Sequence, residues 1–415
     1  MKQLIQSAVI ADPRSPHHGK KRDLLIARGR IEEVAANITD VPKHVVREKG
    51  LHVSPGWVDM AAQFRDPGEE WKEDLHTGLD AAAAGGFTGV VAMPATHPPV
   101  SGKAAVEYAL RKAQGHRTEL LVAGTLSADR DGRQLSEMAD MHCAGAVAFT
   151  DYKRPVNRTE LMTRALDYAR GFNGLILSFP WDDGVATKGV MHEGPMSVSL
   201  GLQGLPSLSE ELRLSRDLDL LRYTGGRMHV LLVSSARSVA LIKAAKKEGL
   251  QVTCGVSAHH LYFSDEALGG FDTQHKVLPP YRGNADVKAL RKAVLDGTID
   301  VVCSDHSPQD IESKAREFEH ADWGFASIET TYPALQAALG DKCTPELVAE
   351  RLALAPRRIL GQEAPVIEAG APANLTLFNP TGSTAVNAAK LASKSTLSPF
   401  DGHTLDGHVV DVIRG

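Results

Sequence analysis

Three charged side chains stand where short apolar runs end, which is where barrels of parallel strands carry their chemistry. Asp151 follows the run at residues 146–149, and Asp305 follows the run at residues 299–303. A carboxylate in such a place can accept a proton from a reacting group or ligate a metal ion. Arg65 can clamp a substrate carboxylate or form a structural ion pair. The pattern predicts a polar site at one end of a set of strands.

Histidines offer one further way to hold a metal. A site assembled from His229, His306, Asp151 and Asp305 would combine imidazole and carboxylate donors. The simpler reading gives both aspartates a structural role, in hydrogen bonds to the backbone or to a nearby cation such as Lys153. Two bare carboxylates at close range would repel each other, and the pKa of one would rise. We therefore favour the structural role.

The middle of the chain alternates between helical and strand-like segments. Helices are predicted at residues 73–85, 158–171, 209–223, 236–249 and 285–297. Continuous apolar runs, which suit parallel strands buried on both faces, lie at residues 89–93, 119–123, 146–149, 175–177, 228–233, 251–253 and 299–303. Alternation over roughly 300 residues favours a (β/α)8 barrel. A doubly wound open sheet is the rival, and the absence of a GxGxxG motif after the first strand weakens it.

The two ends of the chain resemble each other and differ from the middle. Strand-like segments broken by turns lie at residues 24–27, 30–34, 373–378 and 408–413. Neither end can bury both faces of a sheet alone. We therefore expect a small β-sandwich composed of residues 1–53 and 366–415, beside a barrel domain of residues 54–365.

Composition excludes several classes of partner. The chain has 415 residues, with 43% hydrophobic and 23% charged residues and a net charge of −5. This balance gives no reason to expect nucleic acid or an anionic membrane as a partner. No stretch approaches ~18 apolar residues, and the apolar run at the N-terminus is too short for a signal peptide. The four cysteines lack CxxC spacing, which indicates reduced thiols. Because thiols stay reduced in the cytosol, we expect a cytoplasmic protein.

The segment at residues 54–68, SPGWVDMAAQFRDPG, resembles the first motif of dihydroorotases in the amidohydrolase superfamily. In that family the frame is Pro-Gly-hydrophobic-hydrophobic-Asp-x-His-x-His-x-Arg-x-Pro-Gly. Further matching motifs follow in order at residues 191–194, 200–206, 216–217, 224–226, 259–261, 279–282, 304–308 and 393–395. The resemblance covers nearly the whole chain and points to the long form, whose bridging metal ligand is an aspartate. It implies a (β/α)8 barrel of the metal-dependent hydrolase type and a place in pyrimidine biosynthesis.

The same resemblance implies that the metal site has lost its ligands. The family's four ligand histidines fall on Ala61, Gln63, Ser178 and Leu232. The bridging aspartate is kept as Asp151, and the aspartate that is both ligand and general base is kept as Asp305. Zinc takes about four ligands, alanine and leucine have no donor atom, and neutral oxygens suit zinc poorly. We therefore expect no zinc, with Phe179 and Trp181 filling the vacated volume.

Substrate recognition is eroded in the same way. The resemblance implies that the family's arginine is kept as Arg65, while two asparagines fall on Ala95 and Leu278 and a histidine falls on Gln309. Only one of these four positions therefore keeps the family's residue.

These residues lead to one favoured function and two alternatives. The favoured one is a catalytically silent dihydroorotase homologue with a structural or regulatory role. Active and silent members of the family assemble with aspartate transcarbamoylase, so the resemblance implies that partner and a homodimer. The first alternative is an active cyclic amidohydrolase that opens dihydroorotate to N-carbamoyl-aspartate at a rebuilt site, with zinc and with Asp305 as the base. The second is a sensor that binds a carboxylated ring through Arg65.

Overall fold

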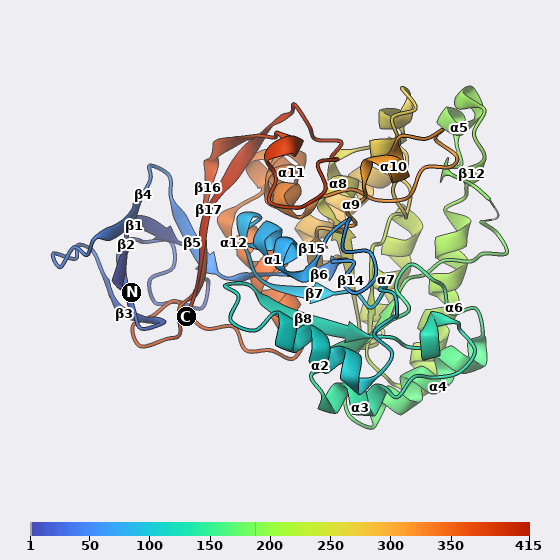
Figure 1. Cartoon of the computed structure of the whole chain (residues 1–415), viewed down its shortest axis with the longest axis horizontal. Helices are drawn as coiled ribbons and strands as arrows, with labels where there is room; N and C mark the ends of the chain where they lie inside the picture. Colours follow the sequence, from blue (N-terminus) through green and yellow to red (C-terminus); the bar gives the residue numbers. More distant parts are fainter. Residues whose placement is uncertain (1, 187) are drawn as a thin grey trace.

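Eight parallel strands form the centre of the molecule (Figure 1). The computed structural model describes residues 2–186 and 188–415. The barrel strands, in the order in which they neighbour one another, are β6 (Trp57–Ala62), β7 (Phe87–Ala92), β8 (Glu119–Gly124), β9 (Ala146–Phe149), β10 (Ile176–Ser178), β13 (Met228–Val230), β14 (Val252–Ser257) and β15 (Val301–Cys303). A parallel bridge between Ala62 and His306 joins the two ends of this sheet. The predicted (β/α)8 barrel is confirmed.

Helices pack around the barrel strands. They are α1 (Leu75–Ala84), α2 (Lys103–Lys112), α3 (Met138–Cys143), α4 (Thr159–Arg170), α5 (Pro195–Leu200), α6 (Leu208–Thr224), α7 (Ala236–Lys247), α8 (Ala258–Tyr262), α9 (Asn284–Asp296), α10 (Ile311–Lys314), α11 (Thr331–Leu339), α12 (Pro345–Val348) and α13 (Ala355–Ile359). All five predicted helices are present as α1, α4, α6, α7 and α9. A π-helical turn at Ala349–Leu354 joins α12 to α13.

Strands from both ends of the chain share a second sheet. It contains β1 (Lys2–Ile10), β2 (Lys21–Ala27), β3 (Arg30–Ala35), β4 (His44–Arg47), β5 (His52–Pro55), β16 (Asn374–Ala385) and β17 (Thr404–Arg414). β16 pairs antiparallel with β5, which joins the last part of the chain to the first. One apolar core, with Ile5 and Leu24 from the N-terminal part and Leu375 and Leu377 from the C-terminal part, lies against this sheet. A short pair, β11 (Met191–His192) and β12 (Gly204–Leu205), stands apart from both sheets.

The first barrel strand contains one of the replaced ligand positions. β6 continues to Ala62, so Ala61 lies inside it. The extension is stabilised at its far end, where Ala62 pairs with Ala92 of β7 and with His306. Both alanines are fully buried in consequence.

Among the described residues, no helix has both the length and the apolar character needed to cross a membrane.

Candidate functional site

The two apolar positions that the resemblance matched to metal ligands belong to one packed cluster inside the barrel. Ala61 and Leu232 are at most 1% exposed and share this cluster with Phe179 and Trp181. The rings of Phe179 and Trp181 stack with their centroids 6.2 Å apart. The aromatic pair that we expected to fill the vacated volume is therefore packed with these two replaced positions. The side chains of Ala61 and Leu232 carry no donor atom, and the close packing of this interior shields both from solvent.

The two polar replacements are engaged elsewhere. The hydroxyl of Ser178 donates a 2.6 Å hydrogen bond to Asp217, whose carboxylate also accepts from Arg216 at 2.9 Å. Gln63 donates its amide to the hydroxyl of Ser307 at 3.2 Å. All of these groups except Arg216 are buried. Both neutral side chains thus serve the local hydrogen-bond network.

Asp151 is held by the segment that follows β8. Its carboxylate accepts the backbone N–H groups of Leu126 at 3.1 Å and Ser127 at 2.9 Å, and also the hydroxyl of Ser127. Burial raises the pKa of Asp151 above its ordinary value, while these hydrogen bonds and nearby Arg130 act in the opposite direction. The expected structural role, hydrogen bonding to backbone, is present.

Asp305 lies in a different and strongly cationic setting. Lys153 Nζ lies 2.8 Å from one carboxylate oxygen and 2.9 Å from the other. The hydroxyl of Tyr152 donates to the same carboxylate at 2.8 Å, and His259 Nε2 lies 3.7 Å away. Burial alone would raise the pKa of Asp305, but Lys153 and His259 bring it down to about 2. Of the two structural roles that we considered for the aspartates, hydrogen bonding to backbone or to a nearby cation, Asp305 shows the second.

The alternative site of two histidines and two aspartates does not form. His306 points its Nε2 at Glu73, 3.4 Å away, and its Nδ1 accepts the N–H of Ser327 at 3.2 Å. His229 shares a 2.8 Å hydrogen bond with Thr253. Within residues 2–186 and 188–415, no three His, Cys, Asp or Glu side chains gather as a metal would require. The family's metal does not fit the donors present.

His229 should make the protein sensitive to acid. Burial lowers its pKa to about 3, whereas an unfolded chain protonates histidine near pH 6.5. The unfolded state therefore binds the extra proton, so the stability that neutral His229 provides is complete above about pH 6.5 and declines as the pH falls toward 3. The free energy of unfolding, measured with urea at several pH values between 6 and 4, should fall with decreasing pH. This fall should be smaller by about 1.4 kcal/mol per pH unit in His229→Asn than in the unaltered protein.

The matched control for this change is His320→Asn, because the side chain of His320 is 71% exposed. Its slope should equal that of the unaltered protein. Equal slopes for His229→Asn and the unaltered protein would show that His229 is protonated in the folded state.

Arg65 forms the structural ion pair that was one of its two predicted roles. Its guanidinium lies 3.1 Å from Glu69 and 3.4 Å from the hydroxyl of Ser307. The side chain is 10% exposed, and its Nε has no partner. Both terminal nitrogens of the guanidinium are therefore engaged within the protein.

The other three positions that the resemblance matched to substrate-binding residues offer little to a ligand. Ala95 and Leu278 are apolar and pack against the barrel cluster. Gln309 is buried, accepts a 2.8 Å hydrogen bond from Lys72 Nζ, and donates one of the same length to the carbonyl of Trp323. These contacts tie the loop after β15 to the segment before α1.

Three hydrogen-bond partners of the candidate site residues were not predicted from the sequence. Tyr152 bonds to Asp305, Ser127 to Asp151, and Asp217 to Ser178. Tyr152 lies directly between Asp151 and Lys153 in the chain, so its neighbours could have drawn attention to it. Ser127 and Asp217 lie 24 and 39 residues from their partners, and no local pattern signals either contact.

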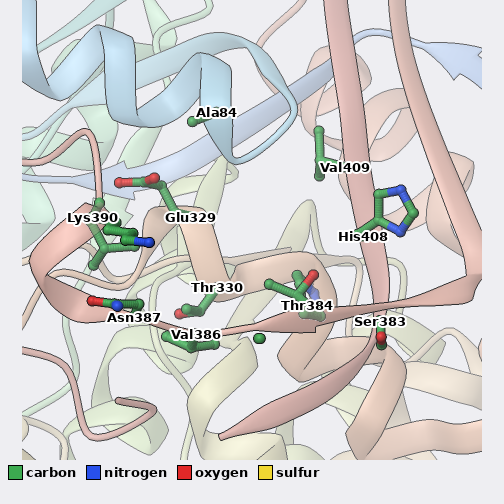
Figure 2. Close-up of a pocket in the computed structure, with 13 residues that line it drawn as sticks. Ala84, Glu329, Thr330, Ser383, Thr384, Val386, Asn387, Lys390, His408 and Val409 are labelled. Atoms are coloured by element: carbon green, nitrogen blue, oxygen red, sulfur yellow. The ribbon is translucent and has the colours of Figure 1, made fainter. Parts of the chain in front are cut away.

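A separate hollow of about 370 Å³ lies between α1, α11 and the hairpin β16–β17 (Figure 2). Glu329 and Lys390 stand on one side of it, and His408 and Val409 stand on the other. Burial raises the pKa of Glu329, whose carboxylate accepts the N–H of Ser393 at 3.2 Å. Its lining includes none of the residues that correspond to the family's site.

Comparisons with known proteins agree on the family. A family model described as "Dihydro-orotase-like" matches residues 50–238. The chain is 39% identical to a dihydroorotase of Pelobacter propionicus over 100% of this chain and 98% of the relative. It is 38% identical to a dihydroorotase of Pelotomaculum thermopropionicum over 98% and 96%.

Solved structures agree on the fold. An L-hydantoinase (dihydropyrimidinase) from Arthrobacter aurescens superposes with a TM-score of 0.87 at 22% identity, over 100% of this chain and 95% of the other. A dihydropyrimidinase from Brevibacillus agri gives 0.84 at 20% identity, over 100% and 94%. With full-length relatives well above 30% identity, this chain belongs to the dihydroorotase family.

Proposed function

We propose that this protein is a catalytically silent member of the dihydroorotase family that acts as a structural or regulatory partner in pyrimidine biosynthesis. One observation carries the first half of the proposal. The two carboxylates that remain from the family's metal site are engaged by the protein itself, Asp151 by backbone N–H groups and Asp305 by Lys153 and Tyr152. A metal ion at either carboxylate would have to compete with these contacts.

The chemistry explains why this arrangement should be silent. Ring opening of an unactivated cyclic amide at neutral pH needs a strong nucleophile, and metal coordination lowers the pKa of water from about 15.7 to about 7. Asp305 is ionised and could accept a proton, but Lys153 and Tyr152 hold the carboxylate that would do so. Among the described residues no group of His, Cys, Asp or Glu side chains could hold the metal that would lower the pKa of water in this way.

The second half of the proposal is the partner. We propose aspartate transcarbamoylase, with this chain present as a homodimer, because family members assemble with that enzyme. A silent homologue that keeps the whole barrel and the terminal sheet also keeps an outer surface on which a partner can bind. Such a surface can position or stabilise a second enzyme without turnover of its own.

The first experiment measures zinc and turnover in the same purified sample. We expect substoichiometric zinc, no opening of dihydroorotate above the buffer rate, and a Tm that a chelator leaves unchanged, since no ion stabilises the native state. Stoichiometric zinc together with ring opening would refute the proposal and establish the active amidohydrolase instead.

The second experiment tests the partner. The chain and the aspartate transcarbamoylase of the same organism are mixed and followed by light scattering, with each protein alone as the control. We expect a species heavier than either, and a change in transcarbamoylase activity or stability when it forms. No heavier species, with a transcarbamoylase that is fully active alone, would refute the partner.

A further inference from the structure

Lys153 and Asp305 form an ion pair in the interior of the barrel mouth. The Lys153 side chain is 12% exposed and that of Asp305 is 1% exposed, so water screens the pair poorly. The ammonium contacts both carboxylate oxygens, at 2.8 and 2.9 Å. Tyr152, which is 1% exposed, donates to the same carboxylate at 2.8 Å. Asp305 is thus paired and hydrogen-bonded as a buried charge must be.

The backbone is shaped to bring these groups together. Tyr152 and Asp305 both adopt left-handed conformations, with φ of 50° and 53°. This conformation costs a non-glycine residue roughly 1 kcal/mol or more. The turn is anchored from outside, because Arg130 donates to the carbonyl of Asp151 at 2.9 and 3.1 Å. Tyr152 and Asp305 lie 153 positions apart in the chain and are joined by a hydrogen bond. Their unfavourable backbone conformations must therefore be stabilised by the residues packed around them.

We propose that Lys153 is a fixed internal cation that takes over the charge-balancing role of a bound metal, so that the barrel is stable without an ion and closed to one. The inference deepens the proposed function and rests on the site being free of metal. In the family the carboxylate at the position of Asp305 is a metal ligand, and here an ammonium already contacts both of its oxygens. A divalent ion at that carboxylate would meet the ammonium at close range, and like charges repel strongly in a buried setting.

The first test is a double-mutant cycle on stability, which compares the unaltered protein with Lys153→Met, Asp305→Asn and the double variant. Lys153→Met keeps the aliphatic stem but leaves Asp305 as a buried, uncompensated charge, so we expect Tm to fall by roughly 5 °C or more. Lys153→Met combined with Asp305→Asn removes both charges and should recover most of that loss. Lys103→Met is the matched control, because Lys103 is 62% exposed in its pair with Glu107, and its Tm should not change. A Lys153→Met protein as stable as the control would overturn the role of Lys153.

The second test asks whether Lys153 excludes a metal. The four ligand positions are restored together as Ala61→His, Gln63→His, Ser178→His and Leu232→His, once with Lys153 retained and once with Lys153→Gly. Both proteins are incubated with zinc chloride, desalted and analysed for bound metal. We expect stoichiometric zinc only where Lys153 is replaced. Zinc in both proteins, or in neither, would overturn the exclusion.

Four histidines in a packed interior can prevent folding, and circular dichroism will show whether they do. In that event the double-mutant cycle, made in the otherwise unaltered protein, decides alone. Neither test repeats the measurement of zinc and turnover in the unaltered chain, so failure of this inference and failure of the proposed function can be told apart.

Discussion

Replacing Glu73 with leucine is expected to lower the free energy of unfolding by about 3–5 kcal/mol. Glu73 is fully buried just before α1 and accepts hydrogen bonds from the hydroxyls of Thr77 and Ser393 and from the N–H of Lys394. His306 Nε2 lies 3.4 Å from the same carboxylate. Leucine would leave the buried Ser393 hydroxyl and the buried His306 ring without this acceptor, and each such orphan costs roughly 1–3 kcal/mol. Urea unfolding at pH 7 measures the loss.

The pH dependence gives this prediction a second readout. Burial alone would raise the pKa of Glu73, but His306 and the two hydroxyls overcome it and lower the pKa below the ordinary value. A lowered folded pKa means that the stability from Glu73 is complete above the unfolded pKa of about 4.3 and is lost as the pH falls through the folded pKa. Acid should therefore narrow the difference between Glu73→Leu and the unaltered protein.

The control is Glu107→Gln on the surface of α2. Its carboxylate lies 3.7 Å from Lys103 and is 46% exposed, so the change should cost less than about 1 kcal/mol. A loss for Glu73→Leu no larger than that of the control would mean that the buried network contributes little to stability.

The barrel could be predicted because its strands and helices follow local patterns. Buried parallel strands are continuous apolar runs, and the five predicted helices show helical periodicity bounded by glycine or polar residues. α2 was missed because its buried face is only Val106 and Ala109, too narrow an apolar stripe to recognise.

The sequence predicted which metal-ligand donors are missing, but it predicted only some of the contacts that the remaining residues make instead. The absence of donors at Ala61 and Leu232 follows from their side chains alone. For both aspartates we expected hydrogen bonds to the backbone or to a nearby cation such as Lys153, but the sequence did not indicate which aspartate takes which partner. The distances, the hydroxyl of Tyr152 and the left-handed backbone at both positions depend on how the loops after β9 and β15 approach each other, and no single segment encodes that approach.

Trp57→Ala is the second change expected to have a large effect, at about 3–5 kcal/mol of unfolding free energy. Trp57 is fully buried at the start of β6, directly after β5 of the terminal sheet. Its ring lies 5.1 Å from Tyr332, 5.4 Å from Phe378 and 6.1 Å from Phe87, so it contacts groups from α11, β16 and β7 together. Its indole N–H donates to the hydroxyl of Ser54 at 2.9 Å. Alanine would leave a cavity where the barrel meets the terminal sheet.

Trp71→Ala is the matched control, because Trp71 is 64% exposed and its indole N–H bonds only to Asp310 at the surface. Truncating it removes an aromatic ring of the same size with no buried cavity, so its cost should stay below about 1 kcal/mol. Guanidinium unfolding followed by circular dichroism compares the two variants. Because Trp57 packs on both parts of the molecule, its loss should also weaken their coupling, so a transition broader than that of Trp71→Ala is expected. Equal midpoints for the two variants would mean that the aromatic contacts of Trp57 do not hold the terminal sheet to the barrel.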